Sequence, residues 1–214
     1  MDAVDEHEIV RVETSAASSG SVSGESLRVF CAVELPRKVR EAAAAHALRL
    51  RRDFPDARAS WARPEGLHIT LKFIGEVEMP HVRALSRAAA AAATGVRHFC
   101  LTIDETGAFP PRGAARVLWL GVKDESGQLS QLRRRLEREC QAAGFPREER
   151  AFKPHLTVAR LRTPKDAHDL SEAHRRTPFG PHRFQVSELL VIRSELGPDG
   201  SRYTPLSRHP FSRP

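Results

Sequence analysis

The chain has 214 residues, 40% of them hydrophobic and 29% charged, so it can bury one sizeable globular core or two small, closely joined ones. Its 34 Lys and Arg residues against 27 Asp and Glu residues give a net charge of +7, which favours an anionic partner without identifying it. No apolar run approaches the roughly 20 residues of a membrane-spanning helix. The N-terminus also lacks a basic stretch followed by an apolar one, so we expect a soluble, cytoplasmic protein with no membrane partner.

The cysteine pattern argues against a metal-bound or disulfide-linked fold. Cys31, Cys100 and Cys140 lie far apart and form no C-x-x-C pair, so neither a zinc knuckle nor a disulfide framework is indicated. We expect reduced, buried thiols, with no metal and no cofactor.

The order of elements follows from composition and periodicity. Residues 1–25 combine acidic positions with a Ser-, Gly- and Ala-rich stretch, and we expect them to form a disordered tail before one domain over residues 27–211. Alternating apolar residues predict strands at 27–35, 67–73, 99–103, 116–122, 155–160, 184–193 and 203–211. Helical spacing predicts helices at 36–54, 80–94, 129–143 and 164–175. Between them we expect a turn-rich lead at 61–66, a strand end at Gly75, a loop at 107–113 and a turn at 197–200.

The two halves of the chain repeat one plan. Arg28 precedes His68 by 40 residues and Arg116 precedes His155 by 39, with one long helix in each interval. Each half then runs through a helix to a strand that opens with Phe, which indicates a duplication. The predicted repeat units cover about residues 27–110 and 116–195.

Each repeat carries one His-x-Thr triplet, His68-Ile69-Thr70 or His155-Leu156-Thr157, with the His and Thr side chains on the polar face of its strand. Chance could supply one such triplet, but two at the same place in a repeat indicate function. One neutral imidazole can take a proton from water while a protonated one gives a proton to a leaving oxygen, which suits phosphodiester hydrolysis. The threonine hydroxyls can hydrogen-bond the phosphate oxygens. A paired-histidine metal site lacks a third and a fourth ligand at typical spacing.

Other polar residues receive more ordinary interpretations. Lys72, on the predicted His68 face, is a candidate for a longer-range phosphate contact or a solvated rim charge. His46 lies within an Ala-rich helix, where we expect a solvated or packing role. Six further histidines fit no repeat position, and we expect them at the surface: His81, His98, His168, His174, His182 and His209.

The stretches His68-Ile69-Thr70-Leu71-Lys72-Phe73 and His155-Leu156-Thr157-Val158-Ala159-Arg160 resemble the paired H-x-T-x motifs of the 2H phosphoesterase superfamily. More narrowly, the chain is similar to RNA 2′,3′-cyclic phosphodiesterases, also known as LigT-like 2′-5′ RNA ligases, over about residues 27–211. The resemblance implies a bilobal, duplicated α+β fold with two pseudo-symmetric, mainly antiparallel sheets, helices outside and a central cleft.

The resemblance also implies roles for individual residues. His68 would be the proton donor and His155 the proton acceptor, with Thr70 and Thr157 holding the phosphate. Phe73 and Arg160 would lie around the terminal base. Strict alternation instead puts Phe73 and Arg160 on the faces opposite the histidines, unless a twist or bulge re-aims them.

The implied activity is metal-independent hydrolysis of RNA 2′,3′-cyclic phosphate ends to 2′-phosphomonoesters by a monomer. Alternatives in the same superfamily are 2′-5′ RNA ligation and hydrolysis of small cyclic nucleotides. An alternative of another class is a nucleotide- or RNA-binding module without catalysis, which the two intact histidines and threonines argue against.

Overall fold

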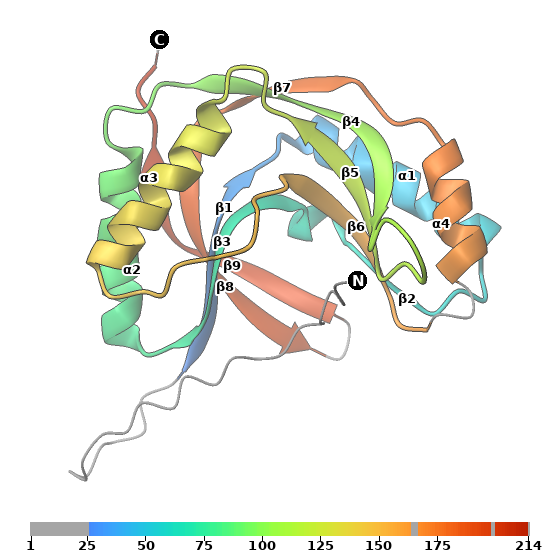
Figure 1. The fold of residues 1–214 in the computed structure, drawn as a ribbon, viewed down its shortest axis with the longest axis horizontal. Helices are drawn as coiled ribbons and strands as arrows, with labels where there is room; N and C mark the ends of the chain where they lie inside the picture. The colour runs from blue at the N-terminus through green and yellow to red at the C-terminus, as the bar shows by residue number, and fades with distance from the viewer. Residues whose placement is uncertain (1–25, 164–166, 198–199, 214) are drawn as a thin grey trace, which may run out of the picture.

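The computed structural model describes residues 26–163, 167–197 and 200–213, which form two curved antiparallel sheets with helices outside them (Figure 1). The strands in order are β1 (Leu27–Glu34), β2 (Ala59–Trp61), β3 (His68–Val77), β4 (Phe99–Phe109), β5 (Val117–Lys123), β6 (His155–Leu161), β7 (His182–Val186), β8 (Glu188–Gly197) and β9 (Gly200–Pro210). The helices are α1 (Arg37–Asp53), α2 (Met79–Ala93), α3 (Gln128–Ala142) and α4 (Ala167–Arg176), with a 3₁₀ turn at Pro64–Gly66. The predicted α+β class is confirmed; the predicted tail lies outside the described residues.

The two sheets exchange strands between the predicted repeat units. One sheet has the order β3-β1-β8-β9 and the other has the order β2-β6-β5-β4-β7. Three neighbouring strands correspond between the sheets, β3-β1-β8 in one and β6-β5-β4 in the other. Strand β4 of the first unit, however, pairs with β5 of the second, and β8 of the second unit pairs with β1 of the first. The last strand of each unit thus lies in the sheet of the other, so neither unit forms a lobe alone.

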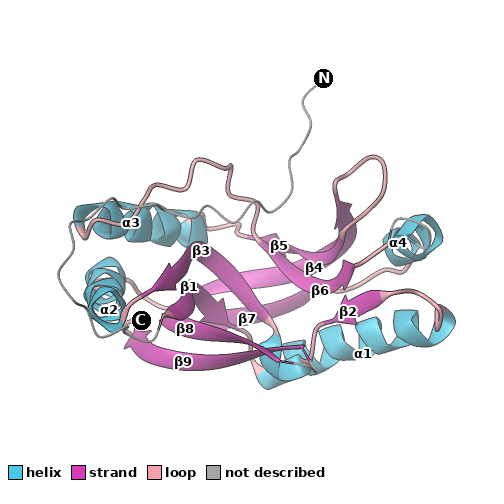
Figure 2. Ribbon diagram, turned by 90° about the horizontal axis from the view of Figure 1, so that it is seen from below, coloured by secondary structure: helices cyan, strands magenta, loops and turns pink. Residues whose placement is uncertain are grey.

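Each predicted unit also places one of its helices on the sheet of the other unit. Helices α2 and α3 cover the sheet that contains β1, and α1 and α4 cover the sheet that contains β6, as Figure 2 shows at its two ends. The apolar stripe of α1, with Val39, Ala43, Ala47 and Leu50 at helical spacing, is buried in the core. None of the helices in the described ranges is long and apolar enough to span a bilayer.

Several predicted boundaries are wrong. The strand expected at 184–193 is two strands, β7 and β8, in different sheets, with exposed Ser187 between them. Strand β4 runs on to Phe109 through part of the expected loop, and β3 continues past Gly75, where φ is +92°. The three-residue strand β2 was missed, and β9 begins three residues before the strand expected at 203–211. Strand β2 is too short to show alternation and is held by pairing with β6, which is distant in sequence.

Strands β3 and β6 each contain a β-bulge directly after the His-x-Thr triplet. Thr70 pairs with Ala32 and Lys72 with Cys31, so Leu71 is an extra residue in β3. In β6 the extra residue is Val158, between the paired residues Thr157 and Ala159. One extra residue reverses the alternation of every side chain that follows it in the strand. The first seven residues of the two strands accordingly show the same order of buried and exposed positions.

The bulge turns Lys72 into the protein interior, so the predicted rim position is wrong. Its side chain is only 2% exposed, and the ammonium group lies 2.9 Å from the Glu137 carboxylate of α3. It also donates a hydrogen bond of 2.7 Å to the carbonyl of Pro146. The Glu137 carboxylate accepts a further bond from the backbone N–H of Glu148. Lys72 therefore ties β3 to the segment that leads into β6.

A second buried polar pair joins α1 and α4 to β5. His174, expected at the surface, is fully buried, and His46 is 2% exposed. The His174 Nε2–H donates to the Trp119 carbonyl at 3.0 Å, because a carbonyl oxygen can only accept. Its Nδ1 then accepts from His46 Nε2 at 3.0 Å. The expected packing role of His46 fits this contact, whereas the surface assignment of His174 is wrong.

We predict that Lys72→Met lowers the free energy of unfolding by about 3 kcal/mol, because it leaves the Glu137 carboxylate buried without its cation. The measurement is urea unfolding at neutral pH. The double variant Lys72→Met/Glu137→Leu removes the unpaired charge and should recover most of the loss. A single variant as stable as the wild type would show that this ion pair does not support the fold.

Candidate active site

His68 and His155 occupy the same position, the first residue of a signature strand, and are anchored in the same way. The Nδ1 atom of His68 lies 2.7 Å from the Gly66 carbonyl oxygen, and Nδ1 of His155 lies 2.7 Å from that of Lys153. Because a carbonyl oxygen only accepts, each Nδ1 carries the hydrogen. Each Nε2 is therefore the proton-exchanging atom, an acceptor when the ring is neutral and a donor when it is charged.

The structure brings the two histidine strands together although they belong to different sheets. Strands β3 and β6 contact each other at the junction of the two sheets (Figure 1). The two side chains are close enough for a charge on His155 to lower the pKa of His68. Thr70 and Thr157 follow two residues later on the same faces, and both are half-buried. His68, Thr70, His155 and Thr157 thus lie on two strands that contact each other, with the His and Thr of each strand on one face.

Aromatic rings contact both histidines. The Phe30 ring of β1 lies 4.6 Å from the His68 ring, and the Tyr203 ring of β9 approaches it edge-on at 4.9 Å. On the other sheet, the Phe109 ring of β4 meets His155 edge-on at 5.2 Å. None of these three residues was predicted from the sequence. They lie on strands other than those of the two histidines, so no local sequence pattern indicates them.

This apolar environment lowers the pKa of both histidines. The pKa of His68 is lowered to about 4, mainly by burial and to a smaller extent by the positive charges of Arg160 and His155, against the opposing effect of the Gly66 carbonyl. The pKa of His155 is also lowered, first by burial and then by Arg160, against the Lys153 carbonyl. Both rings therefore favour the neutral form until a negative charge arrives.

The bulges place Phe73 and Arg160 on the histidine faces, so the opposite faces predicted from strict alternation are wrong. Phe73 is 55% exposed, and its ring lies 6.1 Å from Phe30, the ring that packs on His68. Arg160 is exposed and acts electrostatically on both histidines. Their placement around the terminal base stays a prediction of the family resemblance.

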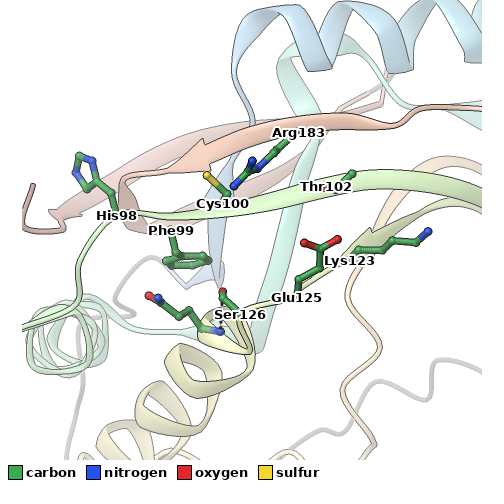
Figure 3. A pocket seen from close by; sticks show the side chains of 9 residues that line it. His98, Phe99, Cys100, Thr102, Lys123, Glu125, Ser126 and Arg183 are labelled. Atoms are coloured by element: carbon green, nitrogen blue, oxygen red, sulfur yellow. Dashed lines mark hydrogen bonds between the residues drawn. The ribbon is translucent and has the colours of Figure 1, made fainter. Parts of the chain in front are cut away.

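The pocket in Figure 3 is lined by neither His68 nor His155; it lies between β4, β7 and the turn before α3. His98, Cys100, Lys123 and Arg183 are among its lining residues, and it includes none of the six predicted site residues. Cys31 and Cys140 are buried and Cys100 is partly exposed; all three are free thiols. Across the described ranges, no group of three or more His, Cys, Asp or Glu residues could hold a metal ion.

Paired His-x-Thr strands on two exchanged antiparallel sheets define a class of two-histidine phosphoesterase folds. A model of the 2′-5′ RNA ligase superfamily matches residues 36–198. The chain belongs to this superfamily.

The similar proteins include named phosphodiesterases. The RNA 2′,3′-cyclic phosphodiesterase of Methanothermobacter thermautotrophicus is 36% identical over 183 residues, which are 83% of this chain and 95% of that protein. The Escherichia coli protein of the same name is 32% identical over 191 residues, covering 86% and 96% of the two chains. The crystal structure of E. coli LigT complexed with 3′-AMP superposes with a TM-score of 0.70 at 32% identity, covering 88% of this chain and 99% of that one.

We predict that Arg160→Gln raises the pKa of both His68 and His155, because a positive charge that disfavours each imidazolium is removed. The measurement is a histidine NMR titration of the free protein. Arg87→Gln, an exposed change on α2, is the matched control and should leave both values unchanged. Identical titrations in the wild type and Arg160→Gln would contradict the placement of Arg160 beside the histidines.

Proposed function

We propose that the protein hydrolyses RNA 2′,3′-cyclic phosphate ends to 2′-phosphomonoesters, with His68 and His155 as its acid and base. The observation that carries the proposal is the matched anchoring of the two Nδ1 atoms, which leaves two Nε2 atoms for proton exchange on contacting strands. The names of the two phosphodiesterases that cover most of the chain support the same substrate.

Hydrolysis needs one group that accepts a proton from water and one group that donates a proton to the leaving oxygen. The neutral Nε2 of His155 accepts a proton from water as the water oxygen attacks phosphorus. The bond from phosphorus to the 3′ oxygen breaks, and Nε2–H of His68 protonates that oxygen, which leaves a 3′-hydroxyl and a 2′-phosphate. The division of labour between the two histidines follows the family resemblance.

The remaining site residues stabilise charge in this scheme. The hydroxyls of Thr70 and Thr157 donate to the non-bridging oxygens, and Arg160 offsets the negative charge of the phosphate. A bound anionic phosphate raises the pKa of an adjacent imidazole, so substrate binding itself promotes the protonated state that His68 needs. Phe73 offers an exposed ring for stacking on the terminal base.

The family description favours ligation as a second candidate function. A 5′-hydroxyl that takes the place of water would join two RNA ends through a 2′-5′ linkage with the same acid and base. Both histidines come from one chain, so we propose a monomer as the working unit. An RNA substrate would place this activity in the cytoplasm.

We predict that His68→Ala and His155→Ala each lower turnover by about 10²–10⁴-fold, because each removes one of the two proton-transfer groups. The measurement is turnover of an oligonucleotide with a 2′,3′-cyclic phosphate end in the presence of a chelator, with identification of the product. The rate should show a bell-shaped dependence on pH, since one imidazole must be neutral and the other charged.

His98→Ala is the matched control, because His98 is half-buried but lies in the separate pocket. It should keep the wild-type rate. A 3′-phosphate product, activity lost in chelator, or near-normal turnover in either site variant would contradict the mechanism.

A further inference from the structure

Three exposed arginines, Arg58, Arg160 and Arg162, lie together at the β2–β6 edge of the five-stranded sheet. Arg160 pairs directly with Ser60 of β2. One step further along, the backbone N–H of Arg162 donates to the carbonyl of Arg58 at 2.8 Å. We call these three residues the arginine stripe.

The register places the stripe on the same face of the sheet as His155. His155 and Thr157 share a face, and the bulge at Val158 returns Arg160 to it. Residues directly opposite each other in antiparallel strands point to the same side of the sheet, and residues two apart in one strand do so as well. Arg162 and Arg58 therefore continue the row that begins at the catalytic candidate.

The stripe carries positive charge that the protein does not neutralise. None of its three guanidinium groups forms a salt bridge with a carboxylate among the described residues, unlike Arg150 and Arg208, which lie 2.9 Å and 2.7 Å from glutamate oxygens. Arg162 instead contacts a neutral group, because its Nε–H donates to the Ser60 hydroxyl at 3.0 Å. That bond holds Arg162 against β2 and leaves its terminal nitrogens for another acceptor.

We propose that the arginine stripe binds the backbone phosphates of the RNA upstream of the terminal cyclic phosphate, an inference that rests on the proposed function. Guanidinium groups bind phosphate through two parallel hydrogen bonds, and a row of them suits a repeating anion. Residues two apart in a strand are separated by about 6.6 Å, and neighbouring strands by about 4.8 Å. Arg160 lies beside the histidines, and Arg162 and Arg58 take the phosphates that follow.

The stripe makes the site selective for polynucleotide ends. A cyclic mononucleotide offers only the reacting phosphate, which the histidines, the threonines and Arg160 contact. An oligonucleotide adds phosphates that reach Arg162 and Arg58. Substrate length should therefore affect KM through these two residues and leave the chemical step unchanged.

The test compares the double variant Arg58→Gln/Arg162→Gln with the wild type on two substrates, a ten-nucleotide RNA with a 2′,3′-cyclic phosphate end and a 2′,3′-cyclic mononucleotide. At 50 mM salt, kcat/KM for the oligonucleotide should fall about tenfold through KM. For the oligonucleotide, the slope of log kcat/KM against log salt concentration should become less negative by about 1.4, the change expected when two phosphate contacts to a single strand are lost. Turnover of the mononucleotide should stay at the wild-type value.

The matched control is Arg83→Gln/Arg87→Gln, which removes two exposed arginines of α2 and should change neither substrate. An unchanged oligonucleotide KM and salt slope, or an equal loss on both substrates, would overturn the inference. Fluorescence anisotropy with the same oligonucleotide measures RNA binding without turnover, so it tests this inference separately from the proposed function. Wild-type protein that binds RNA through the stripe but turns over neither substrate would overturn the proposed function alone.

Discussion

A β-strand sends successive side chains to opposite faces, and one inserted residue reverses that order for the rest of the strand. In β3 the residue inserted after Thr70 is Leu71, ahead of a second register shift at Ile74, and in β6 the inserted residue is Val158. Each insertion lets three functional positions share one face within six residues, because the third follows the second after three residues instead of two. Without the bulge, Phe73 and Arg160 would point into the core, and Lys72 would point toward solvent.

The interior side of the first bulge is stabilised by the ion pair of Lys72 and Glu137, which also contacts the segment before β6. The outer side is an apolar setting of aromatic rings that lowers the pKa of the histidines. The bulge thus links the two strands through Lys72 and also sets the environment of the histidines. The second strand has Ala159 at the position of Lys72, so this link exists on one side of the duplication only.

The sequence alone predicted the elements that carry their own periodicity, such as the helix with Val39, Ala43 and Leu50, and both signature strands. It also predicted that His68 and His155 have equivalent positions. The bulges were not predictable, because an extra residue is defined by the partner strand and not by the strand itself. For the same reason the exchange of β4 and β8 between sheets was missed, as were Tyr203, which reaches His68 from the last strand, and the burial of His174.

The central claim is that the two histidines act on one phosphate. A crystal structure of the protein with a nucleoside 2′-monophosphate bound tests it most directly. The claim predicts Nε2 of His68 and Nε2 of His155 both within hydrogen-bond distance of oxygens that belong to the reacting nucleotide, with Thr70 and Thr157 on its phosphate. A phosphate held by only one histidine, or bound in the separate pocket beside Arg183, would contradict it.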